Sequence, residues 1–293
     1  TAQLSWQLAL SCRALPLNFL PMARSTAVRC LFSGWAYVAA RKIRYSDESS
    51  ETRRCRYGDI IMAKNVVIIG GGASGLMAAI WASRLGAAVT VLEKNDKPGR
   101  KLLATGNGRC NFTNRYQDAS CYRTGNQERA SRVLEQFTEQ DTEQFFEQLG
   151  IRIRSREGWL YPASEQAQSV LELLILEARF RKVKIKTRET AVAVEKAENG
   201  YLVRTEGWQY PADSVIICCG SCASQIAGSD GDTLRFADQL QLASIPFFPA
   251  LCPLRCKGNQ FSSWAGVRVR AKITLLVENQ EVLTEQGELQ LTD

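Results

Sequence analysis

The stretch NVVIIGGGASG, residues 65–75, decides the fold of this chain. The continuous apolar run at residues 66–69 is typical of a parallel strand that is buried on both faces. A helix is expected over residues 73–85, and a second strand, residues 88–92, ends at Glu93. The sequence therefore predicts a β-α-β unit that opens a Rossmann-like, doubly wound α/β domain.

The glycines between the first strand and the helix have the spacing of the dinucleotide fingerprint. Gly70 makes the tight turn, Gly72 lets a pyrophosphate approach the backbone, and Gly75 lets the helix pack on the strand. Free N–H groups at the helix N-terminus then hold phosphate. Glu93 follows Gly75 by 18 residues, where its carboxylate can accept hydrogen bonds from ribose hydroxyls. The alternative is a glycine-rich turn without a ligand.

Two basic segments after Glu93 favour FAD over NAD(P). An acid at this position disfavours the phosphate of NADP. The turn Gly99-Arg100-Lys101 and the loop TGNGRCN, residues 105–111, add flexible, cationic backbone, which a long cofactor needs for its pyrophosphate and flavin half. An NAD(P)-binding dehydrogenase remains open, and so does a plain surface loop.

A family resemblance rests on residues 66–114, where Gly-Arg-Cys-Asn follows the glycine-rich turn. It continues through GWLYP (158–162), GSDGD (228–232) and PALCPL (249–254). The chain resembles the aminoacetone-oxidase-like, or BaiN/YhiN-type, family of FAD-binding flavoproteins over roughly residues 62–293.

The resemblance implies an FAD domain of the glutathione-reductase type that is interrupted by an inserted β-rich domain. We expect the FAD-binding domain at residues 62–244 and the start of an incomplete insert at residues 245–293. The implied activity is FAD-dependent oxidoreduction, with hydride transfer between a small organic substrate and flavin. NAD(P) is a candidate electron donor or acceptor. Family members continue beyond this point into a segment that contacts the flavin, so an inactive FAD-binding fragment is another alternative.

The fingerprint, the basic loops and the resemblance together predict one set of cofactor-binding residues. Ala191 is expected where the backbone reads adenine and Gly220 where a strand end closes over the cofactor, although the family usually has Ala-Thr-Gly-Gly there. Lys101 and Arg109 are either partners of pyrophosphate or reduced flavin, or solvated charges, and Cys110 is either a flavin contact or a structural thiol. No catalytic residue is identified. The full set is Gly70, Gly72, Ala73, Ser74, Gly75, Glu93, Lys94, Arg100, Lys101, Thr105, Gly106, Gly108, Arg109, Cys110, Ala191 and Gly220.

Composition excludes several kinds of chemistry. The chain has no histidine, which excludes Ser-His-Asp, Cys-His and His-metal sites within it. Cys219-x-x-Cys222 lacks the further ligands that zinc needs, so no metal is expected. Residues 1–61 hold nine Lys or Arg against four Asp or Glu and so carry +5 of the +7 net charge. The nearly neutral remainder predicts no nucleic-acid partner.

Residues 1–61 have the composition of a transit peptide or of a reading frame extended upstream. We favour the second, because Met62-Ala63-Lys64 leads directly into a strand, and we expect this extension to be disordered or not native. The apolar run at residues 8–20 is interrupted by polar residues and proline, so no membrane span is expected. Ten cysteines without a paired framework indicate reduced thiols in a cytoplasmic protein.

Weaker patterns predict the other elements. Asp141 is expected to open a helix that ends at Gly150, and Ser164 to cap a helix with an apolar stripe at Leu171, Leu174, Ile175 and Ala178. Strands are expected at residues 182–187, 191–195, 201–205, 214–219, 268–277 and 281–283.

Overall fold

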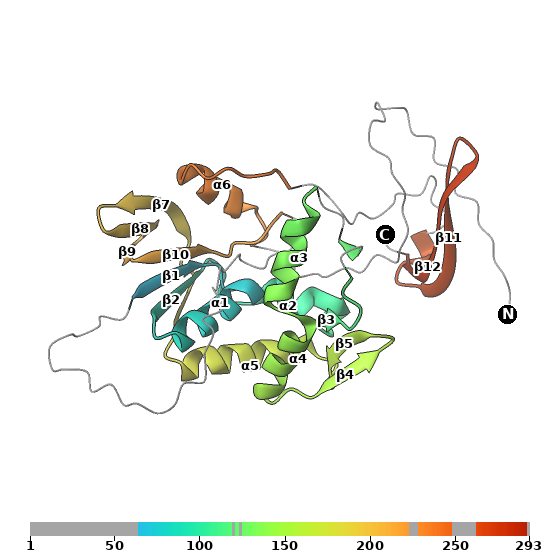
Figure 1. The fold of residues 1–293 in the computed structure, drawn as a ribbon, viewed down its shortest axis with the longest axis horizontal. Helices are drawn as coiled ribbons and strands as arrows, with labels where there is room; N and C mark the ends of the chain where they lie inside the picture. Colours follow the sequence, from blue (N-terminus) through green and yellow to red (C-terminus); the bar gives the residue numbers. More distant parts are fainter. Residues whose placement is uncertain (1–63, 119–120, 123–124, 223–227, 248–261, 292–293) are drawn as a thin grey trace. The chain divides into compact units, whose positions relative to one another are not determined.

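The computed structural model describes residues 64–118, 121–122, 125–222, 228–247 and 262–291 (Figure 1). These residues belong to two compact units, which divide between Pro249 and Ala250. The expectations for residues 1–61 and for the stretch at 249–254 lie outside the described residues. Each unit is described by itself below.

The helices of the larger unit follow the chain between its strands. They are α1 (Ala73–Arg84), α2 (Arg100–Ala104), α3 (Gln127–Gln136), α4 (Glu139–Gln148), α5 (Ala167–Phe180) and α6 (Asp232–Gln239), with a 3₁₀ turn, η1 (Thr105–Gly108). The strands of this unit are β1 (Asn65–Ile69), β2 (Ala88–Glu93), β3 (Thr113–Asn114), β4 (Ile153–Arg156), β5 (Trp159–Pro162), β6 (Lys184–Thr187), β7 (Ala191–Ala197), β8 (Gly200–Thr205), β9 (Gln209–Ala212) and β10 (Ser214–Ile217).

A parallel sheet forms the centre of the larger unit, in the strand order β10-β1-β2-β6. All neighbouring strands run parallel, and Val66 of β1 lies opposite Ser214 of β10 and Val89 of β2. The sheet confirms the Rossmann-like α/β class and the β-α-β unit that the sequence predicts.

The alternation of side chains along β1 divides the core between the two faces of this sheet. Ile68 packs on one face with Ile80 of α1 and Leu174 of α5. Val67 packs on the other face with Val203, in the antiparallel sheet β7-β8-β9. In Figure 1 the β7-β8-β9 sheet and α5 accordingly lie on opposite sides of the parallel sheet. Complete burial of side chains of this size contributes about 1.5–3 kcal/mol each.

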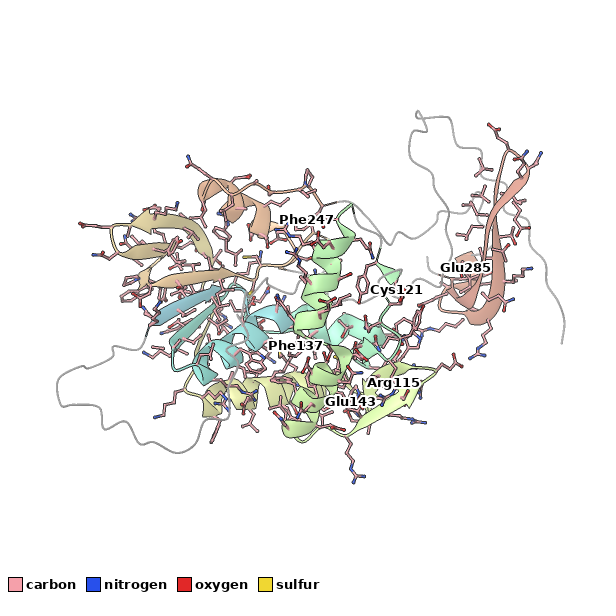
Figure 2. The ribbon with its side chains drawn as sticks, viewed as in Figure 1. Arg115, Cys121, Phe137, Glu143, Phe247 and Glu285 are labelled. Atoms are coloured by element: carbon pink, nitrogen blue, oxygen red, sulfur yellow. The ribbon has the colours of Figure 1, made fainter. Side chains whose placement is uncertain are left out.

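A small antiparallel sheet, β3-β5-β4, lies beside α4. Arg115, just after β3, forms an ion pair with Glu143 of α4 at 3.0 Å, and both are labelled in Figure 2. Phe137, between α3 and α4, meets Trp81 of α1 edge-to-face with ring centroids 6.5 Å apart. These contacts attach the small sheet and α4 to the central domain.

The described residues of the smaller unit form a 3₁₀ turn, η3 (Ser262–Trp264), and a hairpin of β11 (Arg268–Val277) and β12 (Gln280–Gln290). Glu278 and Asn279 have φ of 51° and 62°, as a two-residue type I′ turn requires. The predicted strand at residues 268–277 is confirmed, while the predicted one at 281–283 is only part of β12.

Several boundary predictions are wrong. The strand predicted at residues 214–219 ends at Ile217, and the helix predicted to end at Gly150 ends at Gln148. Asp141 does not open α4: Thr138 is the N-cap, and Asp141 is its partner in a reciprocal capping box three residues later. Ser164 does not cap α5, which starts after Gln166 without a side-chain cap. Strand β6 starts at Lys184, since Lys182 has φ of 61° where the chain leaves α5.

Candidate functional site

Two glycines of the fingerprint are required by close backbone contacts. Gly70 has φ of 104°, and a Cβ atom there would lie 2.4 Å from the carbonyl oxygen of Cys218. A Cβ atom on Gly75 would lie 1.8 Å from the carbonyl oxygen of Gly70. These contacts hold the end of β1, the start of α1 and the segment after β10 together at one point.

Gly72 differs, because a Cβ atom there would meet nothing within 4 Å. It is the N-cap residue of α1, and the helix has no side-chain cap and no acid in its first turn. The first N–H groups of a helix have no partner within the helix and carry partial positive charge. The start of α1 therefore offers backbone donors to an anion in the open space beside Gly72.

A cleft opens at this point, over the carboxyl ends of β1 and β2. Of the predicted site residues it is lined by Gly70, Gly72, Ala73, Ser74, Glu93, Lys94, Arg100, Lys101, Thr105, Ala191 and Gly220. Ligands of open α/β sheets bind in such crevices at the ends of the strands.

The carboxylate of Glu93 is buried and fixed by the chain itself. One oxygen accepts from the Gly71 N–H at 2.8 Å, and the other accepts from the backbone N–H and side-chain Nδ2 of Asn95 at 2.9 and 2.7 Å. A carboxylate has about four acceptor positions, so capacity remains for a ligand hydroxyl.

The predicted cations of the cleft have different partners. Lys94 pairs with Asp230 and with Asp232, the latter at 3.0 Å, while Arg100 pairs with Asp96 at 2.6 Å. Burial alone would lower the pKa of Lys94, but hydrogen bonds to the two aspartates outweigh it and raise the pKa.

Lys101 has a different environment. Its ammonium lies 3.4 Å from the carbonyl oxygen of Ser221 and forms no ion pair with a carboxylate of the described residues. Burial lowers its pKa. Lys101 is therefore the lining cation most available to an anionic ligand.

The second predicted loop reaches the cleft only through Thr105. Gly106, Gly108, Arg109 and Cys110 do not line it among the described residues, and neither does Gly75, which packs beneath it. The Cys110 side chain is fully buried in the hydrophobic core, and burial raises its pKa to about 11.

The two later residues of the set lie at segment ends. Ala191 begins β7 beside the end of β2, where the Glu189 N–H donates to the Glu93 carbonyl at 2.9 Å. Gly220 follows β10 with φ of 75°, and its carbonyl accepts from the Thr233 hydroxyl at 2.7 Å.

Other residues that line the cleft are absent from the predicted set. The GSDGD stretch of the family resemblance, residues 228–232, contains three of them, whereas others join the cleft only through tertiary contacts. They are Ile69, Leu92, Asn95, Gly99, Leu102, Glu189, Thr190, Cys218, Cys219, Ser221, Gly228, Ser229, Asp232 and Phe236.

The comparison with family models decides the family. The model described as the HI0933-like protein Rossmann domain matches residues 64–282, well over half of the chain. The chain belongs to the HI0933-like family. This confirms the BaiN/YhiN-type resemblance.

Three relatives of this HI0933-like chain are similar over about three quarters of its length. A 3-dehydro-bile acid delta(4,6)-reductase of Clostridium scindens is 46% identical over 227 residues, 77% of this chain and 56% of the relative. Ribosomal RNA dihydrouridine synthases of Escherichia coli and Haemophilus influenzae are each 28% identical, over 75% of this chain and 56% and 58% of their own lengths. The chain thus spans a little over half the length of these relatives.

Two negative findings concern the described part of the HI0933-like chain. None of its helices combines the length and apolar character needed to cross a bilayer. It also contains no group of three or more His, Cys, Asp or Glu placed to hold a metal ion.

Proposed function

We propose that this chain forms the FAD-binding part of a flavin-dependent oxidoreductase that transfers a hydride between an organic substrate and the flavin. The observation that carries the proposal is the uncapped start of α1 beside Gly72, where a dinucleotide pyrophosphate can approach backbone donors without meeting a side chain. Family membership supports the same assignment.

The residues of the cleft fit this cofactor. The first turn of α1 would bind the pyrophosphate, Glu93 would accept from the ribose, and Lys101 would provide a positive charge. Bound FAD supplies the hydride-transfer chemistry, while the protein binds and orients it. NAD(P) is the electron donor or acceptor that we propose for this protein. We also propose that the protein is cytoplasmic.

The names of the relatives suggest a class of substrate. One is named for reducing Δ4,6 double bonds of a 3-dehydro bile acid, and two are named for making dihydrouridine from uridine in ribosomal RNA. Both names describe addition of hydrogen to a C=C bond conjugated to a carbonyl. We propose a small unsaturated ketone as the substrate, because the relative that is 46% identical bears the bile-acid name.

Ribosomal RNA is the second candidate, favoured by the two dihydrouridine synthases. The test uses the purified chain reconstituted with FAD and reduced anaerobically. It is mixed with an unsaturated 3-keto steroid or with unmodified ribosomal RNA. The first candidate is supported if the steroid reoxidises the reduced flavin and the steroid product is two hydrogens heavier than the starting steroid. Reoxidation by RNA alone supports the second, and no reoxidation by either refutes both for this chain.

A further inference from the structure

The end of the cleft lined by Glu93, Lys94, Ala191 and Asp232, here called the Glu93 end, is formed by three separate segments. These are the end of β2, the start of β7 and the first residue of α6. Asp232 joins α6 to β2, because its Oδ2 accepts from the Lys94 ammonium at 3.0 Å. Its other oxygen, Oδ1, accepts from Nε and Nη2 of Arg235 at 3.1 and 3.0 Å.

Arg235 extends this connection to β7. Its Nη1 donates to the Val192 carbonyl at 2.5 Å, and its Nη2 donates to the Ala191 carbonyl at 3.3 Å. The pairing register of β7 with β8 shifts directly after Ala191. A bulge of this kind leaves one residue outside the regular ladder. Arg235 thus fixes the backbone at an irregular point of the cleft wall.

The chemistry of the two side chains suits this task. The planar guanidinium presents several donors in fixed directions, so it can bond a carboxylate and two carbonyls at once, which an ammonium cannot do in that geometry. The guanidinium carbon of Arg235 also lies 4.3 Å from the ring centroid of Phe236, whose side chain is almost fully buried. The arginine is therefore supported by the core.

We propose that Asp232 and Arg235 are positioning residues that hold the Glu93 end at the width needed to bind the adenosine half of the cofactor. This inference rests on the proposed dinucleotide site. The two residues act through Lys94 and through the Ala191 backbone. Loss of either connection releases one wall of the cleft and leaves the glycine turn and the parallel sheet unchanged.

The test compares Asp232→Asn, Arg235→Gln and Arg235→Lys with a matched control, Glu195→Gln. Glu195 forms a two-bond ion pair with Arg204 on the same antiparallel sheet, and it does not line the cleft. Calorimetry measures the Kd of the purified chain for FAD and for ADP, which carries the adenosine and the diphosphate without the flavin half. Thermal unfolding of the ligand-free variants is measured in parallel.

We expect Asp232→Asn and Arg235→Gln to weaken FAD and ADP by the same factor, about tenfold to a hundredfold, the equivalent of one charge-assisted hydrogen bond. Arg235→Lys should lose less affinity, because lysine retains the positive charge although it lacks the planar guanidinium. The double variant should bind each ligand no more weakly than the single variant with the larger loss of affinity, since both residues belong to one connection. Glu195→Gln should bind both ligands as the unaltered chain does.

Unchanged ADP affinity in Asp232→Asn and Arg235→Gln would overturn the proposal, and so would a loss confined to FAD. If Arg235→Gln fails to fold, the ADP affinity of Arg235→Lys decides whether Arg235 has the positioning role. An unaltered chain that binds ADP but not FAD refutes the flavin assignment, while the ADP measurements still test the positioning role. An unaltered chain that binds neither overturns both.

Discussion

Gly75 lies so close to Gly70 that a Cβ atom on Gly75 would be 1.8 Å from the Gly70 carbonyl oxygen. This contact joins the first turn of α1 to the end of β1. Gly72, between them in the sequence, has open space instead. The fingerprint thus contains glycines with two different roles, packing and access, which substitutions can separate.

Gly75→Ala is expected to destabilise the fold. The methyl group has no space unless backbone moves, so the free energy of unfolding should fall by more than about 3 kcal/mol, the upper range for overpacking. Chemical denaturation measures the change. Gly125→Ala is the control, because its Cβ would meet nothing within 4 Å. Equal stability of the two variants would contradict the packing role.

Gly72→Ala is expected to leave the fold intact and to weaken the cofactor. Its φ of −75° suits alanine, and losing a glycine N-cap should cost no more than about 1 kcal/mol. The added methyl group occupies the space through which the pyrophosphate approaches the helix, so FAD affinity should fall by at least about tenfold, or about 1.4 kcal/mol. A titration followed by flavin fluorescence checks this. FAD affinity equal to that of the unaltered chain would place the cofactor elsewhere.

Local signals were sufficient to predict the β-α-β unit. The buried run at residues 66–69, the glycine turn and Glu93 all act within one short stretch, and the strand and helix occur where the pattern places them. The two-residue strand β3 had no such signal, because its conformation depends on pairing with β5, whose Leu160 lies opposite Thr113. Asp141 was misread since both members of a capping box are typical of helix starts.

The site was predicted less completely than the fold. Glycines can be read from backbone geometry, but the partners of charged side chains depend on contacts distant in sequence. Lys94 meets Asp230 and Asp232 from more than 130 residues away, so nothing local reveals that its charge is already balanced. The position of Asp232 at the cleft was missed for the same reason.

The thiols are expected to differ in reactivity. Burial raises the pKa of Cys218 and of Cys219 to about 12, whereas Cys222 is exposed. Because the thiolate is the reactive form, iodoacetamide at neutral pH should label Cys222 rapidly and should label Cys218, which is buried, and Cys219, which is half-buried, much more slowly. Cys121, labelled in Figure 2, is half-buried and should react at an intermediate rate.

Peptide mapping by mass spectrometry follows the labelling of each cysteine. Equal rates for Cys219 and Cys222 would contradict the burial argument. Such a result would favour a redox role for the Cys219-x-x-Cys222 pair.

Asp232 should contribute to the acid sensitivity of the fold. Burial alone would raise the pKa of Asp232, but hydrogen bonds from Lys94 and Arg235 outweigh it and hold the pKa below its ordinary value. A carboxyl group with a lowered folded-state pKa stabilises the fold above its unfolded-state pKa, and this contribution is lost as the pH falls through the folded-state pKa.

Denaturation is therefore measured at a series of acid pH values. The free energy of unfolding should fall less steeply with falling pH for Asp232→Asn than for the unaltered chain, and near neutral pH the two plots should run parallel. The comparison variant is Glu195→Gln. A hydrogen bond from Arg204 also lowers the pKa of Glu195, but this ion pair is exposed, so removing it should change the acid slope less than Asp232→Asn does. Identical acid slopes for Asp232→Asn and the unaltered chain would show that the ion pairs of Asp232 do not stabilise the fold.

The claim that the cleft beside Gly72 binds FAD is tested most directly by the visible absorption spectrum of the purified chain, after incubation with FAD and gel filtration. We expect a retained two-banded flavin spectrum that bleaches with dithionite and is weaker in Gly72→Ala than in the unaltered chain. A folded protein that emerges colourless would contradict it.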